Sequence, residues 1–322
     1  MKYIINKGES HRVFPLFFAM SLLYIFNPEH DLCLANGDRN FVPPASALHF
    51  AQSGTNVMRV LYGDNAPVIA ADNYALWQKK NPDTSVQKII PWGWDLRLKQ
   101  TLLKQGADTT LLPDDSRLAD LKALQHRSTA LPLQPHATRA SSVDMVRQFL
   151  LTHTRIVAKA PWSGAGRGVR WIDGALSAHD EQWLARIINT QGCVMVEKRL
   201  DVVYDFAIEF KVENSNLSRL GYSLFKTQSG VYRYNVLLFD DEIKQTVQMS
   251  DESEQNITQW LATNIAPFYD GVFGVDMLHC SDGTNCVSEI NLRHTMGLVA
   301  HEYLRRYPHH HGLHFSPDSL CC

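Results

Sequence analysis

Apolar runs alternate with stretches of helical periodicity over the first 125 residues. The apolar run at residues 22–26 predicts a buried first strand, and residues 57–62 predict a second one. Helices are expected between and after these strands, over residues 46–52, 74–80 and 96–106. Strands that alternate with helices are typical of a parallel α/β sheet, so we expect an α/β domain over residues 21–125.

The first predicted strand runs directly into a polar segment. Asn27-Pro28-Glu29-His30-Asp31 follows it, and a second polar stretch covers residues 36–40. Side chains at the carboxyl end of a first strand can line a ligand crevice. Asn-Pro and Asn-Gly pairs are equally ordinary turn residues. Both interpretations stay open, and the loops at residues 29–40 and 232–235 are the ones we expect to shape a substrate pocket.

Two further α+β units follow a proline-punctuated polar segment at residues 114–137, which predicts a domain boundary. In the second unit, strands are expected at 155–160, 169–172 and 193–197, with helices over 141–152 and 180–190. In the third, strands are expected at 205–212, 220–227 and 231–239, followed by a helix over 253–265 and a hairpin. The predicted divisions are an extension over residues 1–20, the α/β domain, a small lobe over 126–198, a large lobe over 199–308 and a tail over 309–322.

The N-terminal segment at residues 13–26 is mostly apolar and follows a few basic residues, as in the core of a signal peptide. No small-residue cleavage site follows it, and the run is too short to cross a bilayer comfortably. A first buried strand at 22–26 accounts for the run more simply. Met20 offers a second translation start, with residues 1–19 as an extension.

The amino-acid composition narrows the class of protein only modestly. At 322 residues and 45% hydrophobic, the chain can form two or three domains. Its formal net charge of −2 gives no bulk basicity that would favour nucleic acid or an anionic membrane. The six cysteines form no Cys-x-x-Cys pair, so we expect reduced thiols in a cytoplasmic protein.

Two apolar runs flank Asp282-Gly283, which is the sequence signal for a tight β-hairpin. With a two-residue loop, Asp276 lies directly opposite Glu289, and Asn291 lies on the same face. Facing carboxylates repel each other, whereas an Asp/Glu/Asn oxygen set suits Mg²⁺. The pattern therefore predicts a magnesium site. The alternative is a solvent-facing hairpin whose acids only maintain solubility.

A glycine-rich segment at residues 161–168 lies between two predicted strands and has Gly-x-Gly-x-Gly spacing. It lacks the context of a Rossmann motif and the terminal Lys-Ser/Thr of a P-loop. Glycines let backbone amides approach phosphate oxygens, although most glycine-rich loops are simply flexible turns. Lys159 precedes the loop in an apolar strand, and a buried lysine needs an anionic partner. A nucleotide phosphate is a natural partner.

A buried strand at residues 193–197 ends in the charged residues Glu197, Lys198 and Arg199. Exposed backbone at such a strand end can hydrogen-bond an adenine edge, and Asp205 downstream can bind ribose hydroxyls. Taken without context, these acids are surface residues. Their order along the chain favours a functional role for them. The sequence contains, in this order, a strand with a lysine, a glycine-rich loop, a strand that ends in Val-Glu, a downstream acid and the pattern Asp-x12-Glu-x-Asn.

This order of motifs resembles the ATP-grasp superfamily, which includes D-alanine–D-alanine ligase, glutathione synthetase and biotin carboxylase. The resemblance covers roughly residues 126–300. It implies an α/β N-terminal domain followed by a two-lobed α+β ATP-grasp fold. Its most specific element is the spacing of Asp276, Glu289 and Asn291.

The resemblance also implies a role for each matching residue. The phosphate-side residues are Lys159, Arg127, Lys226 and the loop residues Ser163, Gly164, Gly166 and Gly168. The adenine hinge comprises Glu197, Lys198 and Leu200, and the ribose acid is Asp205. Asp276, Glu289 and Asn291 would hold magnesium, for which Mn²⁺ can substitute.

Arg293 falls where the family often clamps an acyl phosphate or carboxylate, and with Lys159 it is the expected catalytic pair. A guanidinium binds a carboxylate in bidentate fashion. The alternative for Arg293 is a helix-cap salt bridge.

The chain departs from the family pattern in several places. The ribose acid is Asp205 rather than the commoner Glu, and residues 232–235 match nothing general in the family, so they are either substrate-specific or a strand with aromatic packing. The histidine tract at 309–311, with His314 and Cys321-Cys322, could bind metal, but a disordered tail is the simpler expectation.

The expected activity is that of an ATP- and Mg²⁺-dependent ligase. It would activate a small-molecule carboxylate as an acyl phosphate for attack by an amine or thiol, releasing ADP and phosphate. The alternatives are a phosphotransferase of the same fold and an ATP-binding regulatory module without turnover. The expected partners are the carboxylate and amine substrates, without nucleic acid or membrane, and a homo-oligomer is compatible with the sequence.

Overall fold

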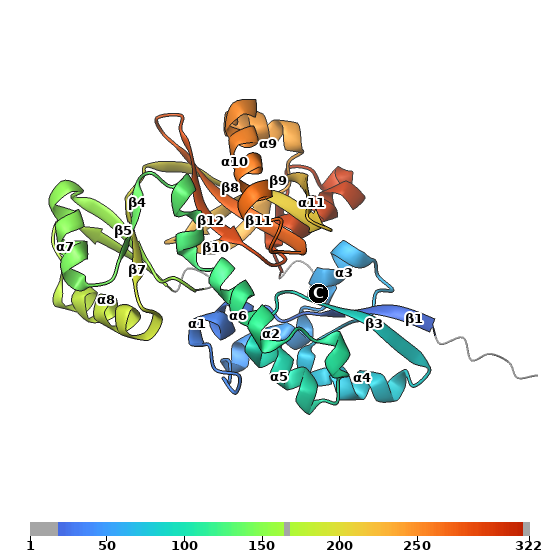
Figure 1. Ribbon diagram of the computed structural model, residues 1–322. Helices are drawn as coiled ribbons and strands as arrows, with labels where there is room; N and C mark the ends of the chain where they lie inside the picture. The colour runs from blue at the N-terminus through green and yellow to red at the C-terminus, as the bar shows by residue number, and fades with distance from the viewer. Residues whose placement is uncertain (1–18, 164–167, 318–322) are drawn as a thin grey trace, which may run out of the picture.

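Three sheets, each with its own helices, make up the protein (Figure 1). The computed structural model describes residues 19–163 and 168–317. The N-terminal unit has a three-stranded sheet, the next unit a four-stranded sheet, and the last a six-stranded sheet. This is the predicted order of an α/β unit followed by two α+β units.

The N-terminal unit is a parallel sheet in the order β2–β1–β3. Its strands are β1 (Ala19–Ile25), β2 (Val68–Ile69) and β3 (Thr84–Pro91). Its helices are α1 (His30–Asn36), α2 (Ala45–Ser53), α3 (Asn56–Tyr62), η1 (Ala71–Asn73), α4 (Tyr74–Lys80), α5 (Leu96–Lys104) and η2 (Thr109–Leu111). Leu23 and Ile25 pack against α5 on one face of β1, whereas Tyr24 and Phe26 pack on the other against α3. This alternation confirms the predicted first strand.

Two predictions in this unit are wrong. Residues 57–62, expected as a strand, form helix α3, because Val57 and Met58 both enter the core beneath β1. Adjacent residues can share one buried side in a helix but not in a strand, so tertiary packing overrides the β-propensity of the apolar run. The polar loop after β1 is also shorter than expected, because helix α1 begins at His30.

The segment at 114–137, expected as a boundary, holds regular structure. It contains α6 (Asp115–Leu124) and the 3₁₀ helix η3 (Arg127–Leu133). Directly after η3, the Gln134 side-chain amide donates to the backbone carbonyls of Val287 (3.1 Å) and Ser288 (2.7 Å) in the predicted metal hairpin. The segment therefore joins the second unit to the third. The exact domain divisions stay a prediction.

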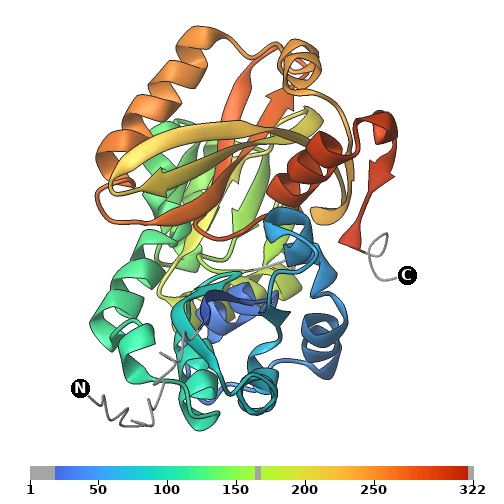
Figure 2. The same ribbon diagram turned by 90° about the vertical axis from the view of Figure 1, so that its right-hand side faces the viewer.

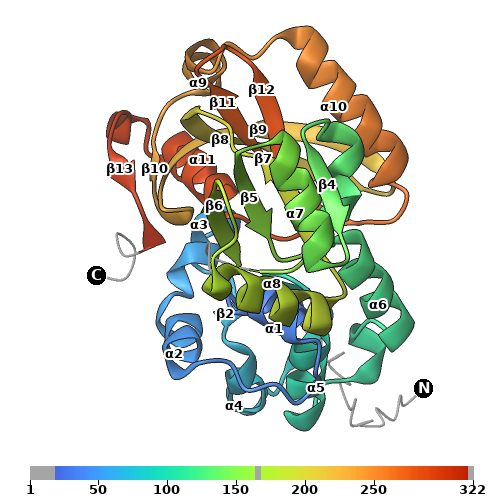
Figure 3. The same cartoon turned by 90° about the vertical axis from the view of Figure 1, so that its left-hand side faces the viewer.

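The second unit is an antiparallel sheet in the order β4–β7–β5–β6. It contains β4 (Ala137–Ala140), α7 (Val143–Thr152), β5 (Arg155–Lys159), β6 (Val169–Asp173), α8 (Ala178–Gln191) and β7 (Val194–Lys198). Figure 3 shows α7 and α8 together on one face of this sheet, and their apolar side chains form one core with β5 and β7. The opposite face carries Lys159 and Glu197.

The third unit is an antiparallel sheet in the order β12–β11–β8–β9–β10–β13. Its elements are β8 (Val202–Glu213), β9 (Asn216–Gln228), β10 (Val231–Val236), α9 (Asp240–Thr246), α10 (Asp251–Asn264), β11 (Gly271–Cys280), β12 (Asn285–Asn291), α11 (Met296–Arg306), η4 (Pro308–His310) and β13 (His314–Phe315). On β8, Phe206, Ile208 and Phe210 enter the core with α9 and α10. The alternate residues of β8 face away from that core.

Helix α11 connects the third unit to the first. In Figure 2 it lies directly beside α3. Val299, Ala300 and Leu304 of α11 share a core with Tyr24 and Trp92 of the N-terminal unit. The third sheet and the N-terminal sheet are therefore packed through one apolar cluster, which positions the residues around its edge.

The C-terminal segment is not a disordered tail as far as residue 317. Residues 308–310 form η4, and β13 pairs with β10, with Phe315 opposite Asn235. Phe315 is buried in the α11 core, and that burial holds the segment. Cys321 and Cys322 lie outside the described residues.

Candidate active site

The predicted hairpin pairing is confirmed, although its turn differs from the prediction. Asp276 is paired with Glu289, and Gly274 with Asn291. The loop has three residues between Cys280 and Thr284, closed by Cys280 N–H donating to the Thr284 carbonyl at 2.9 Å. Gly283 adopts the left-handed conformation that such a loop needs (φ 84°). A three-residue loop shifts the register by one residue, and a second feature restores it.

That feature is a β-bulge at Ser288. Met277 is paired with Val287 and Asp276 with Glu289, so Ser288 has no partner across the hairpin. The Ser288 hydroxyl accepts a hydrogen bond from Lys159 Nζ at 3.1 Å. The bulge thus returns Glu289 to the face of Asp276 and joins the hairpin to the second unit.

One cavity of about 1000 Å³ lies where the three units meet. Ten of the predicted site residues line it: Arg127, Lys159, Ser163, Glu197, Asp205, Lys226, Asp276, Glu289, Asn291 and Arg293. Lys198 and Leu200 do not line it, since Lys198 follows Glu197 on β7 and points to the opposite, exposed face.

The glycine-rich loop is described only at its ends. Gly168 is buried, and its carbonyl accepts a hydrogen bond from Ala160 N–H at 2.8 Å. A Cβ atom on Gly168 would overlap the Ser163 side chain, so glycine is required for the two ends to meet. Gly164 and Gly166 lie outside the described residues.

Lys159 and Glu197 form a nearly buried ion pair on neighbouring strands. Lys159 Nζ lies 2.6 Å from Glu197 Oε1, and their side chains are 12% and 8% exposed. The buried lysine therefore has the anionic partner that its position requires. The same amine contacts Ser288, so it lies between the second unit and the metal hairpin.

Arg127 links three parts of the cavity. Its guanidinium pairs with Glu289 Oε2 at 2.8 Å and donates to Ser163 Oγ at 2.7 Å and to the Ala160 carbonyl. Its Nε is buried and has no hydrogen-bond partner among the described residues. A buried donor without an acceptor is costly, so this atom suits an incoming oxygen anion.

Asp276, Glu289 and Asn291 form an oxygen-rich group on the cavity floor. Asn291 Nδ2 donates to Asp276 Oδ2 at 3.0 Å. Burial, and then the neighbouring Glu289 carboxylate, raise the pKa of Asp276 to about 8. Two carboxylates and an amide oxygen are ligands that Mg²⁺ accepts, so the donor set fits this ion. Among the described residues, no three His, Cys, Asp or Glu side chains gather as a metal-binding group.

Arg293 is held by an acid of the N-terminal unit. Its Nε and Nη2 donate to the two Asp31 carboxylate oxygens at 2.9 and 2.8 Å. Burial alone would raise the pKa of Asp31, but the guanidinium outweighs burial and keeps that pKa below its usual value. Arg293 is thus held in an ion pair with an acid in the first turn of α1. The prediction missed this pair because its members are far apart in the sequence.

The end of the cavity near β6 contains a cation–π pair that the sequence reasoning missed. The Arg199 guanidinium lies over the Trp171 ring, 5.2 Å from its centre, and bonds Asp173 at 3.1 Å. Nearby, Asp205 accepts from Thr227 Oγ1 at 2.8 Å. A flat aromatic surface beside acids and amines suits a nucleobase and its sugar.

The opposite end of the cavity also contains residues that were missed. Aromatic side chains of the N-terminal unit line it together with residues at the start of α11 and one buried acid: Phe26, Phe50, Trp92, Thr295, Met296 and Glu209. Glu209 lies four residues after Asp205 on β8, and an even separation places both on one face of a strand. That spacing was a readable signal.

Residues 232–235 form part of β10. The Tyr232 hydroxyl donates to Asn235 Oδ1 at 2.7 Å, and Tyr234 stacks on His314. Aromatic packing therefore accounts for most of the segment, while Tyr232 also lines the cavity.

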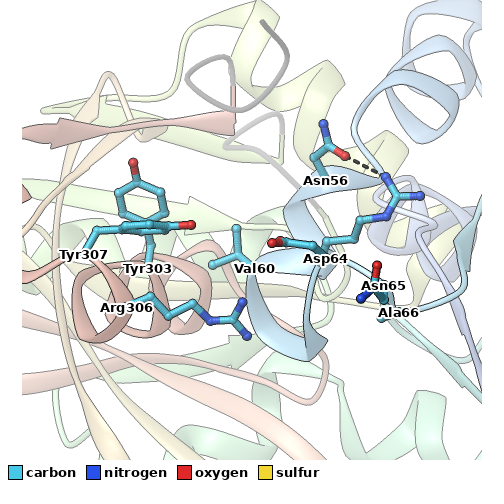
Figure 4. Close-up of a pocket in the computed structure, with 9 residues that line it drawn as sticks. Asn56, Val60, Asp64, Asn65, Ala66, Tyr303, Arg306 and Tyr307 are labelled. Atoms are coloured by element: carbon cyan, nitrogen blue, oxygen red, sulfur yellow. Dashed lines mark hydrogen bonds between the residues drawn. The ribbon is translucent and has the colours of Figure 1, made fainter.

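A smaller cleft of about 560 Å³ lies between α3 and α11, away from these residues (Figure 4). Its two arginines bond within the protein: Arg59 donates to Asn56 Oδ1 at 2.6 Å, and Arg306 donates to Glu302 at 3.1 Å. None of the predicted site residues lines it.

Comparison with solved structures identifies the fold. The structure is similar to D-cycloserine synthetase DcsG (TM-score 0.55, 11% identity, 93% of this chain and 100% of that one). It is also similar to biotin carboxylase from Campylobacter jejuni in an ATP complex (0.54, 13%, 88% and 67%) and to D-alanyl-alanine synthetase A from Vibrio cholerae (0.51, 11%, 94% and 97%). No family model and no curated protein sequence matches the chain.

These neighbours are ATP-grasp enzymes, and the chain has the ATP-grasp fold. The predicted fold is thereby confirmed, with the α/β unit in front of the two lobes. Over the described residues, no helix has the length and apolar character to span a bilayer.

Proposed function

We propose that this protein is an ATP- and Mg²⁺-dependent ligase that activates a small-molecule carboxylate as an acyl phosphate for attack by an amine or thiol. The observation that carries the proposal is the single cavity in which Lys159, Arg127, Arg293 and the Asp276/Glu289 pair converge between two antiparallel sheets. Solved structures of the same fold include a D-alanyl-alanine synthetase and a D-cycloserine synthetase.

Lys159 and Arg127 would bind the nucleotide phosphates. Both are more than four-fifths buried, and a cation in such a site acts more strongly on phosphate oxygens than it does in water. The orphaned Arg127 Nε supplies a further donor. Asp276, Glu289 and Asn291 would hold Mg²⁺, which would neutralise phosphate charge when bound. We also propose that Mn²⁺ can replace Mg²⁺ at this site and that the protein is cytoplasmic.

The substrate carboxylate, which accepts the phosphoryl group, would bind at Arg293. The guanidinium already presents two parallel donors to a carboxylate, that of Asp31. A substrate carboxylate or acyl phosphate can use the same bidentate geometry if Asp31 gives way. Walls from all three units would exclude water, which would otherwise hydrolyse an acyl phosphate.

The test is product analysis with Mg·ATP, pooled carboxylates and hydroxylamine, with wild type beside Glu289→Gln. Wild type should release ADP and form a hydroxamate whose mass identifies the acid, whereas Glu289→Gln should form neither above background. Tight ATP binding without ADP under any carboxylate pool would contradict the ligase proposal and favour a regulatory module. ADP formation with a phosphorylated product and no hydroxamate would favour a phosphotransferase.

A further inference from the structure

Among the described acids that line the cavity, Glu209 is the one whose charge no proposed nucleotide, metal or protein cation accounts for. Glu197 has Lys159, Glu289 has Arg127 and Asp31 has Arg293. Glu29 has Arg97 at 2.7 Å. Asp205 and Asp276 belong to the proposed ribose and metal sites.

The Glu209 carboxylate is fully buried yet borders the cavity. Its exposed fraction is 0%, and it is one of the lining residues. Ser223 Oγ donates to Oε1 at 3.0 Å, and Thr295 Oγ1 donates to Oε2 at 2.8 Å. Both oxygens therefore accept hydrogen bonds from hydroxyls, and neither has an ion-pair partner within the described ranges.

The cations nearest to Glu209 already have carboxylates of their own. His301 Nε2 lies 3.4 Å from Asp240, and Arg293 is bound to Asp31. A buried carboxylate without a cation is expensive, and burial raises the pKa of Glu209 to about 7. The arrival of a cation in the cavity would remove that cost.

The surroundings of Glu209 are shaped to hold its carboxylate in place. A Cβ atom on Gly297, at the start of α11, would overlap Glu209 Oε1, and one on Gly274 would lie 2.9 Å from Oε2. Two glycines from different elements thus leave space that the Glu209 carboxylate occupies together with its hydrogen-bond partners Ser223 and Thr295. Neither glycine lies in a turn that would require it. The missing side chains are therefore explained by the space that the Glu209 carboxylate needs.

The cavity wall next to α11 is apolar and aromatic. Met296 packs against the cluster that contains Phe26 and Trp92, and Phe26 makes edge-on contacts with Phe50 and Trp92 at 5.4 Å each. The side chains of this wall can pack against the carbon skeleton of a ligand, but they carry no charge. A ligand that satisfies both features has a cationic head and an apolar body.

We propose that Glu209 binds the ammonium group of the amine substrate, and that the Phe26/Phe50/Trp92 wall takes its apolar, aromatic or branched, carbon skeleton. This assignment rests on the proposed ligase function and names the class of its second substrate. Glu209 would hold the nitrogen beside Arg293, where the activated carboxylate is expected.

The test measures binding by calorimetry at pH 7.5 with Mg²⁺ and a non-hydrolysable ATP analogue. The probes are benzylammonium and its uncharged counterpart benzyl alcohol. Wild type should bind benzylammonium at least about tenfold more tightly than the alcohol, and Glu209→Gln should remove that preference. Glu213→Gln is the matched control, because it makes the same change on an exposed side chain of the same strand.

Equal binding of both probes by wild type, binding of neither, or an unchanged preference in Glu209→Gln would each overturn the assignment. Melting temperatures of both variants show whether the fold is retained. The exposed control Glu213→Gln should still form hydroxamate with hydroxylamine at close to the wild-type rate. A wild type that forms no hydroxamate but prefers benzylammonium through Glu209 would contradict the ligase function and leave the ammonium site standing.

Discussion

Two halves of the cavity are built in different ways. The strand half, defined by Lys159, Glu197, Asp205, Asp276 and Glu289, takes every one of these side chains from antiparallel strands. Lys159 pairs with Glu197 on the neighbouring strand and donates to the Ser288 hydroxyl across the gap between two sheets. Strand period and register alone place such residues together.

The junction half is defined by Asp31, Trp92, Glu209, Arg293 and Met296. Its residues come from α1, from the ends of β3 and β12, from β8 and from α11. The Arg293–Asp31 pair and the packing of Met296 beside Trp92 therefore depend on how the N-terminal unit packs on the large sheet. Regular strands thus hold the proposed phosphate and metal ligands in fixed positions, whereas the junction would supply a pocket that sequence changes can reshape. We expect substitutions in the strand half to abolish turnover and those in the junction half to change substrate preference.

Glu289→Gln should have the largest effect. It removes one carboxylate from the predicted metal set, so Mg²⁺-dependent turnover should fall at least about a hundredfold. Stability should change little, because losing the ion pair with Arg127 is offset by relief of repulsion with Asp276. The measurements are kcat across a Mg²⁺ titration and the melting temperature. Asp282→Asn at the exposed tip of the same hairpin is the control, and equal losses of activity and melting temperature would contradict the metal assignment.

Lys159→Met should reduce kcat about a hundredfold, since one charged phosphate donor is lost. It should also destabilise the fold, because Glu197 is left buried without its cation. Adding Glu197→Gln should recover stability but not activity. Denaturant unfolding beside steady-state kinetics separates the two effects, with the exposed Lys211→Ala as control. Normal turnover in Lys159→Met would rule out its phosphate role.

The strand half could be predicted from the sequence because its information is local. Asp276 and Glu289 face each other through one hairpin, and the prediction succeeded even though the loop is three residues long and the Ser288 bulge corrects the register. Lys159 was recognisable as a charge in an apolar strand. The roles of these residues stay proposals, while their convergence is observed.

The junction half could not be predicted in the same way. Arg293 and Asp31 lie 262 positions apart, and no local pattern specifies which acid reaches a given arginine. Helix α3 shows the same limit, since its apolar run suits a strand until packing against α11 is known. Strand β13 has only two residues and exists because β10 offers an edge.

Arg293→Lys should distinguish the roles of the two halves of the cavity. The ammonium group keeps the charge but cannot bind a carboxylate through two parallel donors. We expect the kcat/KM for the carboxylate substrate to fall about tenfold, while the KM for ATP stays unchanged. Arg219→Lys, which alters an ion pair outside the cavity, is the control. A rise in the KM for ATP instead would place Arg293 in the strand half.

The smallest expected effect is a pH dependence of stability that comes from Glu209. Burial raises its pKa to about 7 from an ordinary 4.5, so the folded state favours the protonated form. Its contribution to stability is therefore complete below about pH 4.5 and is lost as the pH rises through 7. Since His301, Arg293 and Asp276 face it in both proteins, comparison with Glu209→Gln isolates this one group.

Relative to wild type, Glu209→Gln should gain up to about 3 kcal/mol of unfolding free energy between pH 4.5 and pH 8. Denaturant unfolding at both pH values measures the difference, with Glu213→Gln as the control. Saturating benzylammonium should cancel the gain at pH 8, because a bound cation stabilises the wild-type carboxylate but has no charge to meet in the variant. A gain that persists in its presence would mean that the ammonium group does not reach Glu209, and the junction half would then bind its ligand through the aromatic wall alone.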